Sequence, residues 1–479
     1  MLIRDILDDL ILWKNRPHHP LIISGMRQTG KTFIVKKFGR EFYEHTVYID
    51  FRARKSMHSV FDGDFDVDRM VLSITSAMPS VRFVKGKTLV IFDEIQDCPN
   101  ARSSLKYWDS DARYDVIATG SFLSVRGFRA PYERGISVGY EEHLSMYPLS
   151  FREFLINTGI DISVLGYVNN AFEEGKKIED GVHQSLRSFY LQYLIVGGMP
   201  EAVVAFFETH DINLVRRIQK RILKSLGDDF GRFRDSNGVV KVNESLKLRS
   251  EACLRSLPSQ LAKEYKKFQY SLVEAKGNSP EKASGLEYLL DVGLAVRAYN
   301  TRELSFPLEG VKIDNEFKVF SVDTGLLVSQ LGDDVPARIL SGDLGAYKGA
   351  VAENMVASAF AVAGHPLYYY HAPSGSPELD FVFEDGEDIT IVECKATNNR
   401  ATSMKFVLAN PKRFGFHKAL KIADANVGGG DGFRTMPLYY LGFLRKKEKS
   451  FIVDTVDVSK LKFECDQDQE EGRKAPERG

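Results

Sequence analysis

Apolar positions in the first 120 residues form short continuous runs, and amphipathic stretches separate these runs. Four of the runs predict β-strands, at 21–24, 46–50, 88–93 and 114–119. Residues 2–13 and 33–38 space their apolar side chains as a helix does. Strands that alternate with helices predict βαβ units and a parallel sheet. Because the runs are almost wholly apolar, both faces of this sheet are expected to be covered.

The hydrophobic pattern changes beyond residue 150. It is helical over 150–230, with a break at the Gly-Gly-Met-Pro of 197–200. Short helices followed by a strand are predicted over 243–300, an order that resembles a winged helix. A last α/β region is predicted over 311–458. The tail after Glu464 is charged and almost free of apolar residues, so we expect it to be disordered.

The charge balance limits the classes of protein that fit. The 479 residues include 64 lysines and arginines and 65 aspartates and glutamates, which give a formal net charge of −1. This balance excludes a uniformly basic nucleic-acid coat protein and an acidic disordered protein, but it leaves room for a local basic groove. The length suggests about three domains.

Cysteines and long apolar stretches bear on the compartment. The four cysteines are far apart and form no CxxC pair, so we expect neither disulfides nor a structural zinc site. They are Cys98, Cys253, Cys394 and Cys465. Asp5, Asp8 and Asp9 interrupt the apolar residues at the N-terminus, and no uninterrupted apolar stretch is long enough to span a bilayer. We therefore expect no signal peptide, no membrane partner and a cytoplasmic location.

The glycine loop after the first predicted strand matches the pattern GxxxxGK[ST]. Its residues are Gly25, Met26, Arg27, Gln28, Thr29, Gly30, Lys31 and Thr32. Glycines let the backbone turn so that amide groups point at phosphate oxygens, and the helix that follows adds the positive end of its dipole. Lys31 can reach the β- and γ-phosphates, and Thr32 can bind Mg²⁺. The loop predicts ATP and Mg²⁺ as ligands; the alternative is a chance glycine turn.

Two later strand ends carry candidate catalytic groups. The run at 88–93 ends in Asp93, which is followed by Glu94. We expect Asp93 to orient the Mg²⁺ shell and Glu94 to act as the general base on the attacking water. Ser121 follows the run at 114–119, where it could touch the γ-phosphate or this water. A plain turn at the end of the strand explains Ser121 equally well.

Residues 21–154 resemble the prokaryotic AAA-type ATPases of the P-loop superfamily. The resemblance rests on the segments GMRQTGKT, LVIFDEIQ, ATGS and LSMYPLSFREF of this sequence. It implies ATP hydrolysis, and it raises the possibility of a homo-oligomer in which a neighbouring subunit supplies an arginine finger. In that family the last segment follows a Gly-Arg pair, whereas the order here is Arg134-Gly135. Arg134 and Arg129 are both candidates for the finger.

The last third of the chain places acidic and basic residues in a pattern that suits metal-dependent chemistry. Glu353 lies on a predicted helix, and Asp380 lies on a strand that leads to a hairpin turn. Glu393 and Lys395 share one face of the returning strand, and antiparallel pairing would bring Asp380 close to Glu393. Three carboxylates can hold one or two Mg²⁺ ions, and Lys395 can orient a water or stabilise charge on phosphorus. A surface hairpin with alternating charges is the alternative.

These four residues resemble the acidic and lysine set of the PD-(D/E)xK nuclease superfamily, with Leu379 where a proline often stands. Residues 190–395 also resemble a C-terminal domain of unassigned function that many prokaryotic ATPases of this kind carry. The matching segments are GGMPE, LPSQL, LLDVGL, VDTGLL and ECK. The two resemblances imply a nuclease-like C-terminal domain that is either active or inherited without activity.

The expected organisation is an α/β fold in five parts. They are a parallel-sheet P-loop ATPase core at 1–155, a helical lid or linker at 156–240, a winged-helix-like domain at 241–310, a nuclease-like α/β domain at 311–462 and a disordered tail at 463–479. Lys263, Lys266 and Lys267 lie among aromatic residues and could grip nucleic acid. A solvated helical face explains these lysines equally well.

Two functions remain open from the sequence. The first is an ATP-regulated enzyme that processes DNA, serving defence or mobile DNA. The second is a nucleotide-dependent switch whose C-terminal domain binds a protein partner and cuts nothing. The acidic and lysine set favours the first, and the near-neutral net charge favours the second.

Overall fold

The computed structural model describes most of the compact unit that ends at Leu444. The described ranges are 2–121, 139–234, 240–263, 266–273, 279–342, 347–373, 377–386, 388–415, 417–430 and 432–444. The candidate arginines Arg129 and Arg134 lie outside these ranges, as do Cys465 and the predicted disordered tail. No helix among the described residues is long and apolar enough to cross a membrane.

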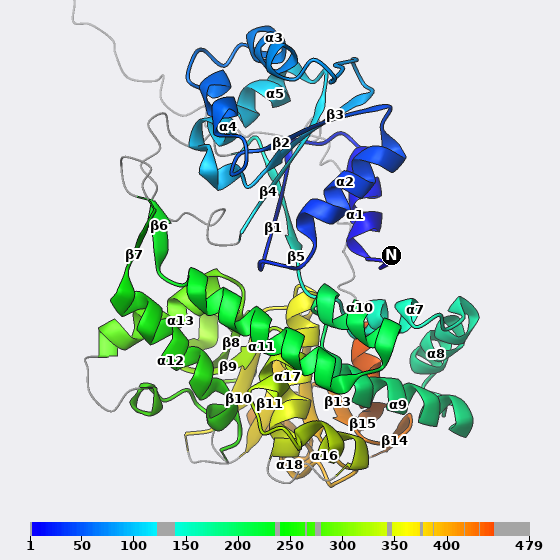
Figure 1. The fold of residues 1–479 in the computed structure, drawn as a ribbon. Coiled ribbons are helices and arrows are strands. Elements are labelled where there is room, and N and C mark those ends of the chain that lie inside the picture. The colour runs from blue at the N-terminus through cyan, green and yellow to red at the C-terminus, as the bar shows by residue number, and fades with distance from the viewer. Residues whose placement is uncertain are drawn as a thin grey trace, which may run out of the picture. The chain divides into compact units, whose positions relative to one another are not determined.

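Five parallel strands form the N-terminal sheet, in the order β2-β3-β4-β1-β5 (Figure 1). The strands are β1 (Leu21–Gly25), β2 (His45–Asp50), β3 (Thr88–Asp93), β4 (Asp115–Gly120) and β5 (Glu142–Met146). The predicted parallel sheet is confirmed, and four of its strands lie where the apolar runs place them. The sequence did not indicate β5, because polar residues such as Glu142 and His143 interrupt its apolar positions and leave only its last residue buried.

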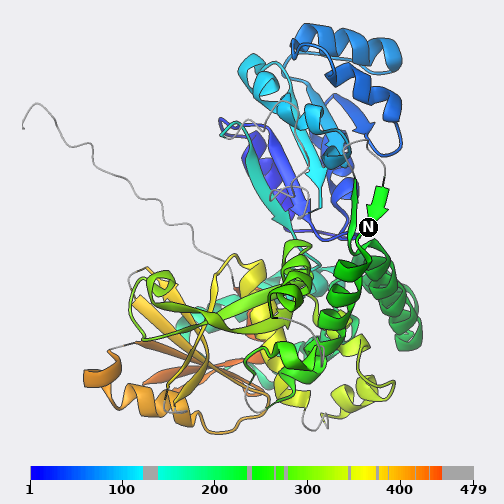
Figure 2. The same cartoon turned by 90° about the vertical axis from the view of Figure 1, so that its left-hand side faces the viewer.

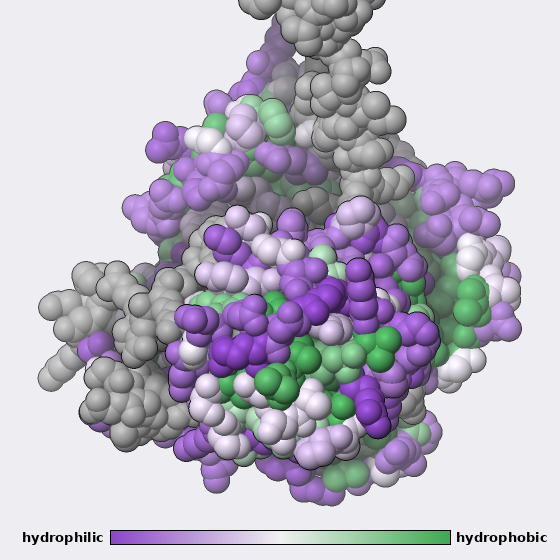
Figure 3. Space-filling model, turned by 90° about the horizontal axis from the view of Figure 1, so that it is seen from above, coloured by the Kyte–Doolittle hydropathy of each residue, from purple (hydrophilic) through white to green (hydrophobic). Residues whose placement is uncertain are grey.

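Helices cover both faces of this sheet. They are α1 (Ile6–Lys14), α2 (Lys31–Phe42), α3 (Val67–Ala77), α4 (Pro99–Ser103) and α5 (Leu105–Asp111). Leu89 and Ile91 of β3 pack in a cluster with α1 and α2. Val90 and Phe92 pack in a second cluster with α3, α4 and α5. Neighbouring residues of one strand thus serve two cores, which is why the strand is apolar throughout. Hydrophilic residues, with hydrophobic ones among them, cover the surface seen in Figure 3.

Helices make up most of the sequence from residue 151 to residue 229. They are α7 (Phe151–Asn157), α8 (Ile162–Glu174), α9 (Asp180–Val196), α10 (Pro200–Thr209) and α11 (Ile212–Asp229). Gly197 and Gly198 separate α9 from α10, as the sequence predicts. A Cβ atom on Gly198 would lie 2.1 Å from the carbonyl oxygen of Leu149, so only glycine fits at this crossing. The Gly198 N–H donates to Asp323 over 2.7 Å, which ties the break to a distant segment.

Eight strands form the C-terminal sheet, in the order β14-β15-β13-β12-β11-β10-β8-β9. The strands are β8 (Ala295–Thr301), β9 (Lys312–Ser321), β10 (Leu367–His371), β11 (Glu378–Asp385), β12 (Asp388–Lys395), β13 (Lys418–Ala423), β14 (Gly428–Gly430) and β15 (Phe433–Pro437). The yellow-green, yellow and orange arrows in the lower part of Figure 2 belong to this sheet. A separate two-stranded sheet pairs β6 (Arg232–Arg234) with β7 (Val240–Val242).

The C-terminal sheet extends across the predicted boundary at residue 310. β8 pairs in parallel with β10 and antiparallel with β9, so both of its edges are filled. The strand assigned to a winged-helix-like domain at 241–310 is therefore part of the larger sheet. The helices that precede it, α12 (Glu244–Leu261) and α13 (Ser279–Asp291), pack against β9 and β8.

Further helices accompany the C-terminal sheet. They are α14 (Leu308–Val311), α15 (Thr324–Ser329), α16 (Val335–Ser341), α17 (Tyr347–Val362), α18 (Thr402–Leu408) and α19 (Pro411–Phe414). The buried residues of α17 share a core with Val392 of β12, whereas those of α18 share a core with Ile391. α17 and α18 therefore lie on opposite faces of the sheet, because neighbouring residues of a strand point to opposite faces.

Candidate active site

The phosphate-binding loop connects β1 to α2, and its shape depends on two glycines. A Cβ atom on Gly25 would lie 2.2 Å from the carbonyl oxygen of Met146 on β5, so any side chain there would push the neighbouring strand away. Gly30 has a φ of 94°, in the left-handed region that other residues rarely adopt. α2 begins directly after it, at Lys31. The backbone amides of the first helical turn therefore face the loop, as phosphate binding requires.

Lys31 lies across the loop. Its Nζ donates hydrogen bonds of 2.9 Å to the carbonyl oxygens of Gly25 and Met26. Burial lowers the pKa of the ammonium to about 8, although the carboxylates of Glu94 and Asp93 act in the opposite direction. When a nucleotide binds, the Lys31 ammonium would leave these neutral carbonyl oxygens and pair with charged phosphate oxygens.

The carboxylate of Asp93 accepts hydrogen bonds from hydroxyl groups of three other elements. The Thr32 hydroxyl of α2 donates to Asp93 Oδ2 over 2.9 Å, and the Tyr48 hydroxyl of β2 donates to the same oxygen over 2.7 Å. The Thr119 hydroxyl of β4 donates to Oδ1. The Asp93 residue is only 3% exposed, at the carboxyl end of β3. The two side chains predicted to meet Mg²⁺, Thr32 and Asp93, are thus in direct contact.

Glu94 follows β3 in a left-handed conformation, with φ 54° and ψ 48°. Such a conformation is unfavourable for a residue with a side chain and is often found at functional sites. Its Oε2 lies 3.0 Å from Arg52 Nη2 and also accepts a hydrogen bond from the Gln96 amide. Arg52 Nε in turn contacts Asp97 Oδ2 over 3.1 Å. In this arrangement the proposed base is bound by a cation and an amide.

The outer part of the loop contacts α11 and the N-terminal segment. Arg27 Nη1 pairs with Asp229, the last residue of α11, and Gln28 Nε2 donates to the hydroxyl of Ser225 over 3.3 Å. The carbonyl oxygen of Thr29 accepts from the guanidinium of Arg4 over 2.9 Å. These three loop residues therefore bind other parts of the chain. We expect their backbone amides to be the groups that meet phosphate.

The structure extends the residue set expected for the ATP site. Ser121 follows β4, but the neighbouring Thr119 is the residue whose hydroxyl meets Asp93. Local sequence patterns did not single out Tyr48 or Arg52. Thr119 belongs to a strand end that the sequence had marked, whereas Tyr48 and Arg52 reach the site only through the pairing of β2 with β3.

The second predicted site lies in the C-terminal sheet, where Asp380 and Glu353 act on each other. The Cys394 N–H donates to Asp380 Oδ2 over 2.8 Å. Burial, and then the negative charge of Glu353, raise the pKa of Asp380 to about 7. Glu353 lies on α17 and is only 6% exposed, and its Oε1 pairs with Lys266 Nζ. Its Oε2 is buried and has no hydrogen-bond partner among the residues that the structure describes.

Glu393 is held on the face of the sheet that α18 covers. It shares its face with Ile391, which packs with α18. Its Oε2 accepts the N–H of Met404 over 3.1 Å, and its Oε1 lies 2.7 Å from Lys395 Nζ. These contacts bind Glu393 to α18 and to Lys395. In the part of the chain that the structure describes, no group of three or more histidine, cysteine, aspartate or glutamate side chains is arranged to hold a metal ion.

Two lysines from distant segments form ion pairs in the region around Asp380 and Glu353, and we call this group of acidic residues and lysines the cluster. Lys318 of β9 is only 1% exposed, and its Nζ lies 2.7 Å from Glu378 Oε1. Lys266 reaches Glu353 from the segment after α12. Sequence reasoning did not find these contacts, because 87 positions separate Lys266 from Glu353 and 60 separate Lys318 from Glu378.

The lysines proposed to grip nucleic acid are engaged within the protein. Lys266 pairs with Glu353 and Lys267 pairs with Glu316 over 2.9 Å. Lys263 Nζ donates to Gln260 Oε1 over 2.9 Å. The nearby aromatic residues Phe268 and Tyr270 pack against Phe317. The contacts engage these lysines within the protein, but residues 266–268 are not helical and Lys266 is only 14% exposed, so the segment is not a solvated helical face either.

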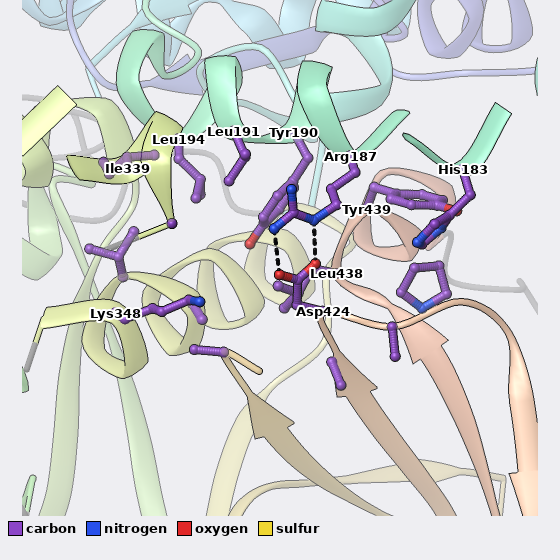
Figure 4. Close-up of a pocket in the computed structure, with 17 residues that line it drawn as sticks. His183, Arg187, Tyr190, Leu191, Leu194, Ile339, Lys348, Asp424, Leu438 and Tyr439 are labelled. Carbon is purple, nitrogen blue, oxygen red and sulfur yellow. Dashed lines mark hydrogen bonds and ion pairs between the residues drawn. The ribbon is translucent and has the colours of Figure 1, made fainter. Parts of the chain in front are cut away.

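A separate cavity of about 40 Å³ is lined by α9, α16, the start of α17 and the segments after β13 and β15 (Figure 4). Its walls are mostly apolar. Arg187 donates two hydrogen bonds to Asp424, over 2.6 and 2.7 Å. His183 Nδ1 lies 2.6 Å from the Tyr439 hydroxyl oxygen. The hydroxyl of Tyr190 is buried and finds no hydrogen-bond partner in the ranges that the structure describes. Local spacing does not indicate this cavity, since its residues come from separate parts of the sequence.

Comparison with known families assigns the N-terminal part. Residues 17–155 match a family described as an AAA domain. Two families described as domains of unknown function match residues 187–336 (DUF8612) and 348–441 (DUF4143). β8 and β9 fall in the first of these two regions and β10 to β15 in the second, so both regions contribute to one sheet. A search among curated proteins finds no match.

Solved structures with similarity to the chain include the Walker-type ATPase PABY2304 of Pyrococcus abyssi. It is 16% identical, with 69% of this chain and 96% of that chain covered and a TM-score of 0.39. The RuvB Holliday junction branch migration motor of Thermotoga maritima is 12% identical, with coverages of 62% and 90% and a TM-score of 0.29. The ORC2 protein of Aeropyrum pernix in its ADP form is 13% identical, with coverages of 71% and 92% and a TM-score of 0.27.

None of these TM-scores reaches 0.5, so the assignment rests on the family match and on the geometry of the loop. The match covers the whole five-stranded sheet, the phosphate-binding loop and the Asp93 contacts. The chain therefore carries an AAA-type P-loop ATPase domain over residues 17–155.

Proposed function

We propose that this domain binds and hydrolyses Mg·ATP with Lys31 on the β- and γ-phosphates, Thr32 and Asp93 around Mg²⁺, and Glu94 as general base. The observation that supports the proposal is the 2.9 Å hydrogen bond between Thr32 and Asp93. A hydroxyl and a carboxylate oxygen thus lie together near the start of α2, where the helix amides would meet the phosphates. Mg²⁺ takes such oxygen ligands together with phosphate oxygens and waters.

The roles can be separated by two substitutions. Lys31→Ala should remove most of the affinity for ATP, because it deletes the positive charge on the phosphates. Glu94→Gln should keep ATP binding and stop turnover, because an amide cannot accept the proton of water. Binding of a labelled ATP analogue and release of phosphate measure the two effects. Hydrolysis by Glu94→Gln at the wild-type rate would show that another group is the base.

We further propose that the C-terminal sheet carries a divalent-cation site for phosphodiester cleavage, with DNA as substrate and ATP as regulator. The buried, unpartnered Oε2 of Glu353 near Asp380 supports this proposal. Mg²⁺ is commonly bound through one or two carboxylates while it keeps several waters. These two residues therefore suit the ion without Glu393. Lys395, on which the charge of Asp380 acts, would stabilise charge on phosphorus.

The alternative is a nucleotide-dependent switch whose C-terminal domain binds a protein partner and cuts nothing. Ion pairs already engage Glu353 with Lys266 and Glu393 with Lys395, which favours a closed structural cluster. Incubation with single- and double-stranded DNA and RNA, with Mg²⁺ or Mn²⁺ and with or without ATP, separates the two functions.

Cleavage that Asp380→Ala and Lys395→Ala both abolish would support the cation site. Each variant should keep the wild-type ATPase rate, because both residues lie outside the ATPase sheet. No cleavage under any condition would favour the switch.

A further inference from the structure

The cation paired with Glu353 comes from a segment that contributes no strand to the C-terminal sheet. Residues 266–268, the strap, form neither helix nor strand and lie beside the middle of β9. The Phe268 N–H donates to the Phe317 carbonyl oxygen over 2.8 Å, and Lys267 pairs with Glu316. Lys266 at the start of the strap thereby reaches Glu353, and the side chains of this pair are 14% and 7% exposed.

The other two lysines of the cluster pair with other carboxylates, although the charge of Glu353 also acts on Lys318. Lys318 is held by Glu378 over 2.7 Å, and Lys395 is held by Glu393 over 2.7 Å. Lys266 is the lysine whose Nζ contacts Glu353 in the described structure. A buried pair with a purely structural role usually satisfies both oxygens of its carboxylate. Within the described part of the chain, Glu353 Oε2 has no hydrogen-bond partner, and the charge of Glu353 also acts on Asp380.

We propose that Lys266 is a removable latch that occupies the place of a divalent cation at Glu353 and Asp380. The inference rests on the proposed cation site and adds its regulation. An ammonium and a divalent ion compete for the same carboxylate oxygens, since both satisfy a buried negative charge. The ion would use Oε2 as well, which the ammonium leaves unpaired. Departure of the strap opens the site, and its return closes the site.

Binding of MnCl₂ to the full-length protein, without nucleotide, tests the latch. Lys266→Met removes the charge and keeps an unbranched apolar side chain, so Mn²⁺ should bind at least tenfold more tightly than to the wild type. Lys267→Met is the matched control, because the neighbouring lysine of the same strap pairs with Glu316 outside the cluster. Its Mn²⁺ affinity should equal that of the wild type. Adding Asp380→Asn to Lys266→Met should abolish the gain.

A second measurement needs no substitution. If Mn²⁺ displaces the latch, acetylation of Lys266 by an amine-reactive reagent should rise with Mn²⁺ concentration, while acetylation of Lys267 stays constant. This result decides the question even if Lys266→Met does not fold. Equal Mn²⁺ affinity of the folded Lys266→Met variant and the wild type would overturn the latch. Unchanged acetylation of Lys266 at saturating Mn²⁺ would do the same.

Failure of the latch and failure of the nuclease proposal give different results. Tighter Mn²⁺ binding by Lys266→Met without cleavage of any nucleic acid supports the latch and removes the nuclease proposal. Cleavage by the wild type at a rate that Lys266→Met does not change overturns the latch and leaves the nuclease proposal standing.

Discussion

The ammonium of Lys31 must leave two backbone carbonyls when phosphates enter the loop. Burial lowers its pKa to about 8 in the free protein, and a bound triphosphate raises the pKa because it favours the charged form. ATP affinity should therefore be constant below about pH 7 and fall as pH rises above 8. By pH 10 the loss should approach about 100-fold, which corresponds to two pKa units. Titration of a fluorescent ATP analogue between pH 7 and 10 measures it.

A variant with a permanent charge controls for other titrating groups. Lys31→Arg remains cationic across this range, so whatever affinity it retains should not depend on pH. Calorimetry in buffers of different ionisation enthalpy should also detect uptake of a proton when the wild type binds ATP near pH 9. A flat affinity profile for the wild type would mean that the Lys31 pKa is not lowered.

The contact of the Gly197–Gly198 break with the segment before α7 holds several elements together. Gly198→Ala would place a Cβ atom 2.1 Å from the Leu149 carbonyl oxygen and 2.7 Å from its nitrogen. The backbone would have to move, and the Gly198 N–H bond to Asp323 would be disturbed with it. We expect the free energy of unfolding to fall by about 2 kcal/mol or more, in the range of overpacked cores. Urea unfolding followed by circular dichroism measures the change.

Gly166 of α8 supplies the control for this substitution. A Cβ atom there meets no atom within 4 Å. Alanine inside a helix is favoured over glycine by roughly 0.5–1 kcal/mol, so Gly166→Ala should be neutral or slightly stabilising. Equal effects of the two substitutions would show that the crossing at Leu149 has room to adjust.

An element could be predicted from the sequence where residues close together in the chain determine it. β3 is a continuous apolar run that ends in two acids, and both its burial and the position of Asp93 follow from that pattern. β5 is half polar, and only its pairing with β1 makes it a strand. In the C-terminal sheet, alternation along β12 separates Glu393 from Cys394 as expected. The contact of Asp380 with the Cys394 N–H, and the arrival of Lys266, depend on tertiary packing that no local spacing encodes.

Separate cores underlie the stability of the whole molecule. Two clusters of buried apolar residues pack against the ATPase sheet. A third cluster contains residues of the helices from α7 through α11 together with residues of the C-terminal sheet. We expect calorimetry to resolve two transitions, and Mg·ADP should raise only the one that belongs to the ATPase sheet. At 100 times its dissociation constant, the nucleotide adds about 2.7 kcal/mol to the state that binds it.

Gly198→Ala identifies the second transition, because Gly198 and Leu149 border the third cluster. The substitution should lower that transition and leave the nucleotide-dependent one in place. A single transition that Mg·ADP shifts as a whole would show that the two sheets unfold together.

The eight-stranded sheet also sets the order of events while the ribosome makes the chain. The ATPase sheet has all its strands once Met146 has been added, but β8 cannot pair with β10 until His371 exists, and β15 ends only at Pro437. At about 5–20 residues per second, the interval between the two sheets is tens of seconds. During that time the newly made β8–β9 hairpin presents an open edge to other chains. Nascent chains of this protein are therefore most exposed to aggregation while the second half is being translated, after the ATPase sheet has all its strands.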